Sequence, residues 1–464
     1  MSLSVFNAGP PEPCPHPFNL AEYVLSAGDD AAPALIVADG SDWAQTTWRY
    51  ADLRGAVYRT AGGLAAHGIE PGDRILLRVG NDPAFAILFL GAIILGAHPV
   101  PTSTQLTEAE VRAIADELDP ALCCFAGGLL PFALPCPTLD TNEVAALSAA
   151  DPVPAELGSP DRLAYMIYTS GTSGKPRAVM HAHRAVWARR MMWDGWYGLR
   201  ADDRMLHAGA FNWTYTLGTG LLDPWAIGAT AMIYTGAPDR RVWGKLATQL
   251  QPTIFAAAPG VLRQITAVGA EGFDRLRHTL SAGEKLPPAV RDAWRAQTGT
   301  EVYEALGMSE CSTFISHPAG KAPDPTTAGQ VQPGRHIAVL GPDGQPVQAG
   351  TPGQLAIHRS DQGLMLGYLG QSEDTQARYQ WDWFLTGDTV AMVDGTVTYL
   401  GRDDDMMNAG GYRVSPLEVE SVLLTHPDVA EAAVVEQEVK PGVTVIVAHF
   451  VGPATPEELT EFCA

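Results

Sequence analysis

Hydrophobic positions follow two alternating patterns through the first two thirds of the chain. Leu53, Val57, Ala61 and Leu64 have helical spacing, which predicts a helix over 49–68, and residues 108–118 show the same period. The stretch 84–97 has 14 residues without a charge. About 20 would be needed to cross a bilayer, so this stretch predicts a buried helix and no membrane span. Short β-rich runs separate the helices, at 34–38, 74–78, 230–234 and 253–257. The alternation predicts an α/β fold in which helices cover the sheets on both faces.

The pattern changes after about residue 327. Turn-forming Pro–Gly and Asp–Gly pairs separate short strands at 336–340, 354–358 and 396–400, which predicts a small β-rich lobe. A helix is expected to begin at Ser415, followed by strands at 429–435 and 443–451 and an amphipathic helix from 457. We therefore expect a large N-terminal domain over 1–402, containing two helix-covered sheets and the β-rich lobe over about 327–402. A partial α+β C-terminal domain is expected over 403–464.

Charge and cysteine content restrict the class of partner and the compartment. The chain of 464 residues carries 30 Lys and Arg against 52 Asp and Glu, a formal net charge of −22. Nucleic acid and anionic membranes attract basic surfaces, so neither is expected as a partner. The six cysteines form neither a disulfide framework nor a zinc pattern. We therefore expect a cytoplasmic protein.

The strongest local motif is a glycine- and hydroxyl-rich loop between two apolar runs at 165–180. Backbone N–H groups at such glycines can turn inward as an anion nest, and the hydroxyls and lysine add donors for phosphate oxygens. Pro176 stands where a Walker loop has its Mg2+-binding hydroxyl, so this is a different motif. Taken alone, the loop could equally be a flexible hairpin. Its residues are Thr169, Ser170, Gly171, Thr172, Ser173, Gly174 and Lys175.

Later segments, taken in their order along the chain, favour the phosphate interpretation. They are SAGEK at 281–285, EALGMSE at 304–310, TGD at 386–388, GRDDD at 401–405 and GGYRVSP at 410–416. Together with the loop they resemble the adenylate-forming superfamily of acyl-CoA synthetases, adenylation domains and luciferases, from about residue 30 to the end. Segments 212–229, 281–284 and 294–299 are most similar to medium-chain acyl-CoA synthetases and benzoate-type CoA ligases.

The resemblance implies an ATP-dependent ligase that uses ATP, Mg2+ and coenzyme A and forms an acyl-AMP from a carboxylic acid. Thr169, Lys175 and Glu310 would be catalytic, and Glu310 would bind Mg2+ through its carboxylate. Asp388 would accept the two ribose hydroxyls, with Arg402 near the ribose and α-phosphate. The C-terminal lobe would swing about a hinge at Asp404. The remaining cofactor-binding residues implied are the loop 169–175, Gly283, Glu284, Glu304, Ala305, Leu306, Gly307, Met308 and Ser309 for ATP, and Gly410, Gly411 and Tyr412 for the pantetheine tunnel of CoA.

The implied acyl pocket predicts a neutral, apolar acid of medium-chain or aryl size. Gly307 stands where acetate-activating relatives have a tryptophan, and no Lys or Arg falls in the wall segments to pair with a second carboxylate. Asn212 replaces the Asp that amino-acid-activating relatives use, which argues against an amino acid. The alternative is that Trp213 and Tyr215 simply pack in the core. The expected wall is Phe211, Asn212, Trp213, Thr214, Tyr215, Ala282, Gly307 and Met308.

Several features depart from the family pattern or leave alternatives open. Leu306 occupies a site where relatives often stack an aromatic ring on adenine, so weaker ATP binding is expected. The adenylating lysine of the family lies beyond residue 464, so we expect a truncated chain with an impaired first half-reaction. Transfer to a carrier-protein pantetheine and a non-catalytic acyl or nucleotide binder remain alternatives, and a homodimer is compatible with the family. The pair His181 and His183 is expected to lack a metal, and Cys311 to be a packed thiol.

Overall fold

The computed structural model describes all residues except 1, 10, 40–43, 170–176, 237, 238, 240, 404, 406, 410, 411, 441, 442, 463 and 464. The chain forms two compact units. The large unit contains Ala8–Arg335 and Ser360–Ala377, and the small unit contains Met1–Asn7, His336–Arg359 and Arg378–Ala464. The chain therefore leaves the large unit after Arg335 and returns to it for one short segment.

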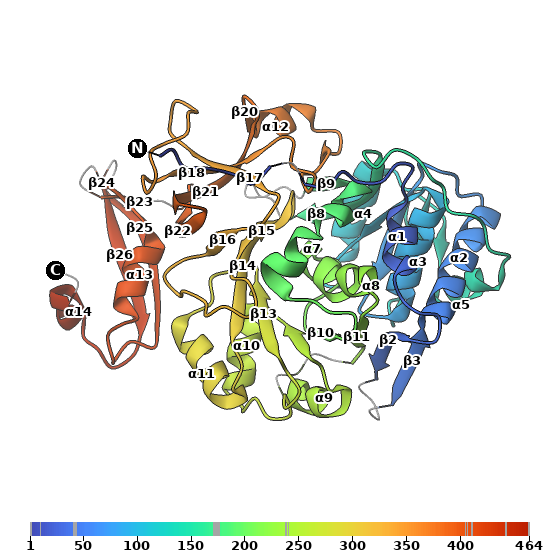
Figure 1. The fold of residues 1–464 in the computed structure, drawn as a ribbon, viewed down its shortest axis with the longest axis horizontal. Coiled ribbons are helices and arrows are strands. Elements are labelled where there is room, and N and C mark those ends of the chain that lie inside the picture. The colour runs from blue at the N-terminus through green and yellow to red at the C-terminus, as the bar shows by residue number, and fades with distance from the viewer. Residues whose placement is uncertain are drawn as a thin grey trace. The chain divides into compact units, whose positions relative to one another are not determined.

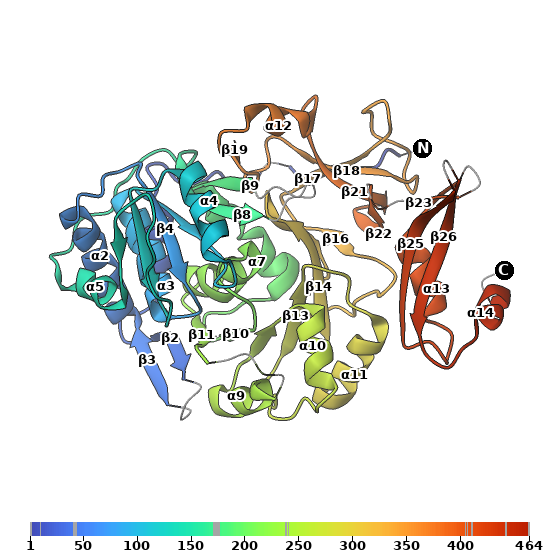
Figure 2. The same cartoon turned by 180° about the vertical axis from the view of Figure 1, so that it is seen from behind.

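One sheet of the large unit has the strand order β5-β4-β6-β7, with parallel neighbours. Alternate residues of β4 point to opposite faces. Ile75 and Leu77 pack in one hydrophobic cluster with α2 and α3, whereas Leu76 packs in another with α4. Figures 1 and 2 show the helices on both sides of this sheet. The elements are β4 (Arg74–Val79), β5 (His98–Pro101), β6 (Leu122–Ala126), β7 (Thr138–Leu139), α2 (Tyr50–Ala66), α3 (Pro83–Leu95) and α4 (Glu108–Leu118).

A second sheet of the large unit runs in the order β16-β15-β14-β13-β12-β10-β11-β2-β3. Its six central strands, β14, β13, β12, β10, β11 and β2, are parallel. Strand β3 is added antiparallel at one end of the sheet, and β15 and β16 are added antiparallel at the other. Phe255 and Trp294 belong to the cluster beneath α9–α11, while Trp196 and Leu280 pack on the opposite face. The elements are β2 (Pro33–Ala38), β3 (Gln45–Arg49), β10 (Arg204–His207), β11 (Thr230–Tyr234), β12 (Ile254–Ala256), β13 (His278–Ala282), β14 (Val302–Met308), β15 (Ser312–Ser316), β16 (Gly329–Val331), α9 (Val242–Leu250), α10 (Pro259–Thr266) and α11 (Pro288–Thr298). These two sheets confirm the predicted α/β class.

The third sheet of the large unit is small and contains the two strands that flank the glycine-rich loop. Strand β9 pairs antiparallel with β8 on one side and with β19 on the other. Strand β19 comes from the returning segment Ser360–Ala377. The remaining elements are β8 (Leu163–Thr169), β9 (Arg177–Ala182), β19 (Gly367–Tyr368), α1 (Leu20–Ser26), α5 (Thr141–Ala146), α6 (Arg184–Ala188), α7 (Thr214–Leu217), α8 (Asp223–Ala226), α12 (Ser372–Ala377), a 3-10 turn (Leu147–Ala149) and π-type turns (Trp193–Tyr197, Gly218–Leu222).

The small unit contains the predicted β-rich strands and the C-terminal elements. Strands β1, β17, β18, β21 and β22 pair antiparallel in that order where the pairs are described. The bounds are β1 (Val5–Asn7), β17 (His336–Leu340), β18 (Gly353–His358), β20 (Tyr379–Gln380), β21 (Trp383–Val393), β22 (Thr396–Arg402), β23 (Met407–Ala409), β24 (Tyr412–Val414), α13 (Pro416–Leu423), β25 (Glu431–Lys440), β26 (Val443–Val451) and α14 (Pro456–Phe462). The predicted boundary at 402/403 remains a prediction.

The main difference from the sequence analysis lies at the N-terminus. The proline-rich start has too little hydrophobic period to predict a strand, yet Val5–Asn7 pair with Ala338–His336 of β17. A three-residue edge strand is specified by its partner rather than by its own pattern, which explains the miss. Within the part of the chain that the structure describes, every helix is too short or too polar to cross a membrane.

Candidate active site

Glu310 lies in the tight connection of the β14–β15 hairpin. A bulge falls between Leu306 and Gly307, where the two strands approach closely. A Cβ atom at Gly307 would lie 2.5 Å from the carbonyl oxygen of Ser312, and Ser312 itself has a positive φ of 64°. A contact this short is not tolerated, so a side chain at 307 would force the backbone of this hairpin to shift. The close approach of the two strands therefore accounts for the glycine at 307, from which an open acyl pocket was predicted.

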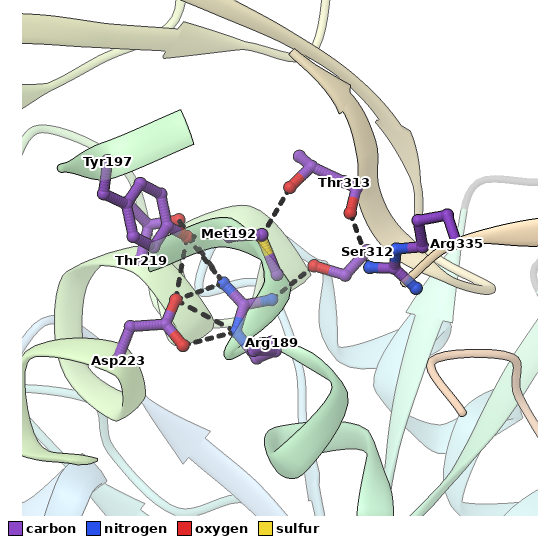
Figure 3. A network of polar contacts seen from close by, with 8 residues as sticks. All are labelled: Arg189, Met192, Tyr197, Thr219, Asp223, Ser312, Thr313 and Arg335. Carbon is purple, nitrogen blue, oxygen red and sulfur yellow. Dashed lines mark hydrogen bonds and ion pairs between the residues drawn. The ribbon is translucent and has the colours of Figure 1, made fainter. Parts of the chain in front are cut away.

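A buried ion pair between Arg189, directly after α6, and Asp223, at the start of α8, supports this hairpin (Figure 3). Arg189 donates to Asp223 from Nε at 2.9 Å and from Nη2 at 2.6 Å. Tyr197 donates to the same carboxylate at 2.8 Å, and Arg189 Nη1 reaches the hydroxyl of Ser312. Burial raises the pKa of Asp223, while Arg189 pulls it in the opposite direction. The ion pair therefore anchors Ser312, the residue that directly follows the connection containing Glu310.

A second buried ion pair supports the same connection. Arg335 and Asp361 approach to 2.6 Å and are both fully buried. Arg335 also donates to the carbonyl oxygen of Thr313 at 2.8 Å, and its Nη1 lies 3.6 Å from the thiol of Cys311. Burial raises the pKa of the Cys311 thiol, so it stays protonated and unreactive at neutral pH. Cys311 is a packed thiol, as expected.

Glu310 is half-buried and has defined partners. The hydroxyl of Tyr368 donates to Glu310 Oε1 at 2.7 Å, and the N–H of Met365 donates to the Glu310 carbonyl oxygen at 2.8 Å. Both partners belong to the returning segment Ser360–Ala377. A partly exposed carboxylate is the ligand type that Mg2+ prefers, so the chemistry of Glu310 fits this ion.

The residues expected around adenine lie directly after β13 and along β14 from Glu304 onward. Gly283 has a positive φ of 103° and Glu284 is exposed, its Oε1 accepting from the N–H of Gly260 at 3.2 Å. Glu304 is engaged within the fold, since it accepts from the N–H of Leu286 at 2.7 Å and pairs with Arg291. The register brings 281–282 beside 304–305. The predicted set thus shares one edge of the second sheet, with Ala305 buried and Leu306, Met308 and Ser309 half-buried.

The glycine-rich loop is described only at its edge. Thr169 ends β8 and pairs with Arg177 of β9, so the two strands bring the two ends of the loop together. Ser170, Gly171, Thr172, Ser173, Gly174 and Lys175 lie outside the described residues, as do Asp404, Gly410, Gly411 and the side chain of Tyr412. Their assigned roles therefore stay predictions.

Asp388 and Arg402 lie opposite each other on β21 and β22 of the small unit. Arg402 Nη1 lies 3.5 Å from Asp388 Oδ1, and the hydroxyl of Tyr399 donates to the same oxygen at 3.3 Å. The backbone N–H of Asp388 donates to Thr386 Oγ1 at 3.1 Å. Burial raises the pKa of Asp388, and Arg402 opposes that shift. The structure thus brings the predicted pair together and adds Tyr399 to it.

The segment 211–215 divides between core and surface. Phe211 is buried against Phe85, with ring centroids 5.3 Å apart, whereas the side chain of Trp213 is exposed. Tyr215 packs edge-on to His207 at 4.5 Å and donates to the carbonyl oxygen of Leu280 at 3.2 Å. Asn212 and Thr214 are half-buried, while Ala282 is buried on the neighbouring strand β13. Trp213 therefore does not pack in the core, and Tyr215 is anchored at the edge of it.

The two histidines at 181 and 183 are structural. Both are buried, and burial lowers the pKa of each to about 3, so they are neutral. His183 Nδ1 accepts from the N–H of Leu20 at 3.0 Å, and His181 stacks on Tyr165 at 4.7 Å. Among the described residues there is no group of three His, Cys, Asp or Glu that could hold a metal ion.

Five residues near these positions were missed in the sequence analysis. Most of these residues contact partners that lie far away in sequence, so no local pattern reveals them. Tyr399 is the exception, because it precedes Arg402 on a predicted strand and could have been suspected from that position. Asn81 is a further example, since its side chain bridges the carbonyl oxygen of residue 209 and the N–H of residue 211 at 2.8 and 3.1 Å. The missed residues are Asn81, Arg189, Asp223, Tyr368 and Tyr399.

Comparisons with known proteins agree with this geometry. The profile of a family described as AMP-binding enzyme matches residues 27–369. Benzoate–CoA ligase of Thauera aromatica is 32% identical over 395 residues, covering 79% of this chain and 73% of that protein. 3-Hydroxybenzoate–CoA ligase of Aromatoleum sp. (strain CIB) is 30% identical over 424 residues, covering 86% and 80%.

A solved structure gives the same result for the fold. A benzoate CoA ligase from Burkholderia xenovorans LB400 superposes with a TM-score of 0.83 at 28% identity, covering 96% of this chain and 93% of that one. The similarity therefore extends beyond the profile match into the C-terminal elements.

Proposed function

The chain belongs to the AMP-binding enzyme family, and we propose that it activates a neutral aromatic or medium-chain carboxylic acid. It is an ATP-dependent acid–thiol ligase that works with Mg2+ and coenzyme A. The observation that carries the substrate proposal is the set of wall residues at 211–215, 282, 307 and 308. These positions contain no Lys or Arg, and the two relatives named above are ligases of benzoate and of 3-hydroxybenzoate.

The proposed mechanism needs few catalytic side chains. The substrate carboxylate is already ionised at neutral pH, so it can attack the α-phosphorus of ATP without a general base. Pyrophosphate leaves. The thiol of CoA, having lost its proton to solvent, then attacks the acyl carbon of the acyl-AMP, and the C–O bond to AMP breaks so that AMP leaves. Positioning and charge neutralisation supply most of the rate enhancement in transfers of this kind.

Each proposed residue then has one physical task. Lys175 and the N–H groups of the loop would hold the β- and γ-phosphates, and Glu310 would hold Mg2+. When bound, the Mg2+ ion neutralises charge on the phosphate oxygens. Asp388 would accept the ribose hydroxyls through its two carboxylate oxygens, and Arg402 would favour its ionised form against the effect of burial.

A panel of acids tests the substrate class. Binding is measured by calorimetry with a non-hydrolysable ATP analogue and Mg2+, for benzoate, 3-hydroxybenzoate, octanoate, terephthalate and phenylalanine. Terephthalate and phenylalanine would leave a buried charge unpaired, so we expect them to bind at least about 10-fold more weakly than benzoate. Equal or tighter binding of either one would refute the proposal.

A charge introduced into the wall sharpens the test. Met308→Lys would supply a partner for a second carboxylate, so terephthalate should gain affinity relative to benzoate. Val393→Lys makes the same change at an exposed position of the small unit and should alter neither acid. If the two variants behave alike, Met308 does not line the acid site.

The acceptor is tested separately. Carboxylate-dependent exchange of pyrophosphate into ATP distinguishes an enzyme from a non-catalytic binder. Competition between CoA and a pantetheinylated carrier protein distinguishes the two thiol acceptors, and we expect CoA to be the better one.

A further inference from the structure

Tyr368 belongs to a strand that is added to the glycine-rich-loop hairpin from a distant part of the chain. Gly367 and Tyr368 of β19 pair with Met180 and Val179 of β9. The N–H of Leu366 donates to the carbonyl oxygen of Met180 at 2.8 Å. Tyr368 is 3% exposed. The pairing therefore fixes this side chain next to the strand that leaves the loop.

The returning segment holds Glu310 at two points. Tyr368 donates its hydroxyl hydrogen to Oε1 of the Glu310 carboxylate at 2.7 Å, while Met365 binds the Glu310 carbonyl oxygen at 2.8 Å. A hydrogen bond to an ionised acceptor is stronger and more directional than one between neutral groups. Glu310 is half-buried, so its carboxylate remains partly accessible. The hydrogen bond from Tyr368 to Oε1 therefore restricts rotation of the Glu310 carboxylate.

The Tyr368 ring is itself held in place. The guanidinium of Arg177 lies over the ring, 5.1 Å from its centroid, and Arg177 pairs with Asp374 of α12 at 3.4 Å. The backbone N–H of Tyr368 donates to Thr375 Oγ1 at 3.0 Å. Arg177 is the first described residue after the loop. A cation over the ring face is attracted to it, so this contact helps to hold the Tyr368 ring in place.

We propose that Tyr368 is a positioning residue for Mg2+: it restrains one oxygen of the Glu310 carboxylate, and the other oxygen would then be the one available to bind the metal. This rests on the proposed function, in which Glu310 is the metal ligand. Mg2+ demands near-ideal octahedral geometry, so a ligand that rotates freely binds it less well. Partners that orient a metal ligand typically change metal affinity by about 10- to 100-fold when removed.

The test compares Tyr368→Phe with Tyr50→Phe. Tyr50 is also buried in the large unit and donates its hydroxyl at 2.7 Å, but to the carbonyl oxygen of Ala229. Both variants lose one hydroxyl of the same kind, and only the first loses a contact with Glu310. Mn2+ binding is followed by the loss of the free-ion electron paramagnetic resonance signal, with a non-hydrolysable ATP analogue bound. We expect Tyr368→Phe to raise the Mn2+ Kd about 10-fold and Tyr50→Phe to leave it unchanged.

Two further measurements separate this inference from the proposed function. Glu310→Gln should weaken Mn2+ binding strongly, and adding Tyr368→Phe to it should cause no further loss. If Glu310→Gln leaves the Mn2+ Kd unchanged, the metal-ligand assignment fails. If Glu310→Gln weakens binding but Tyr368→Phe does not, only the positioning role fails. A lower melting temperature without a change in Mn2+ Kd would likewise show that the Tyr368 hydroxyl serves the fold alone.

Discussion

The buried Arg189–Asp223 pair makes a quantitative prediction about stability. Arg189→Met removes the guanidinium and leaves Asp223, which is 0% exposed, with the hydroxyl of Tyr197 as its neighbour but without its counter-charge. Breaking a buried ion pair from one side costs about 3–5 kcal/mol of folding free energy, because the remaining charge is uncompensated. We expect a loss of that size at pH 8.

The loss should depend on pH, with a sign that follows from Asp223. Burial already raises the pKa of this carboxyl and Arg189 opposes the shift, so removing Arg189 moves the pKa further up. A carboxyl whose pKa is higher in the folded than in the unfolded state binds a proton on folding, and stability then falls as the pH rises between the two pKa values. Arg189→Met should therefore recover up to about 1.4 kcal/mol for each pH unit lowered within that range.

Urea unfolding followed by tryptophan fluorescence at pH 8 and pH 5 measures both effects. The matched control is Arg190→Met, because the neighbouring arginine pairs with Glu12 at the surface, where an ion pair contributes about 1 kcal/mol or less. The double variant Arg189→Met/Asp223→Leu removes both charges and should recover most of the loss. The reasoning is refuted if Arg189→Met and Arg190→Met are equally stable, or if the double variant is as unstable as the single one.

Two further predictions concern the small unit and the hairpin. Asp388→Asn removes a charged acceptor and should weaken ATP binding, measured by calorimetry, by about 10-fold or more. The control is Asp382→Asn, which changes an exposed carboxylate paired with Arg359 in the same unit and should leave ATP affinity unchanged. Equal ATP affinities of the two variants would exclude Asp388 from the nucleotide site. Gly307→Ala forces a Cβ against the backbone of Ser312 and should cost about 1–3 kcal/mol in urea unfolding. Gly80→Ala places its Cβ at an ordinary 3.5 Å from a side chain and should stay within about 0.5 kcal/mol of the parent, so similar losses at both positions would contradict the strand-contact explanation.

Local patterns predicted most of the elements because the period of the buried positions is set within each element. The helix expected at 108–118 is Glu108–Leu118, and the strands expected at 230–234 and 443–451 have those bounds. The helix expected at 49–68 is three residues longer than the observed Tyr50–Ala66. The helix expected at 84–97 begins one residue later and ends two residues later than the observed Pro83–Leu95, since helix ends depend on capping contacts. Strand β25 runs to Lys440 rather than 435, because its length is set by pairing with β26.

The sequence predicted candidate site residues only where they fall in short contiguous motifs. Asp388 and Arg402 belong to separate motifs, and the family resemblance assigned both of them to the ribose. The structure pairs the two residues across β21 and β22, while their role toward the ribose stays a prediction. Tyr368 reaches Glu310 across 58 residues and Arg189 reaches Ser312 across 123. The hydrophobic period within one helix or strand carries no information about contacts between such distant residues.

Gly307 shows why a motif residue needs its structure before its role can be argued. From the sequence, the absence of a side chain at 307 indicates room for a larger acid. In the structure, the same absence lets the backbone of Ser312 approach closely, because its carbonyl oxygen lies 2.5 Å from where a Cβ would be. Ser312 is in turn held by the buried Arg189, so glycine at 307, a positive φ at 312 and the ion pair belong to one arrangement. A bulky substitution at 307 would therefore disturb the position of Glu310 before it reported anything about the acid, and the size of the acyl pocket has to be tested from another wall, at Met308.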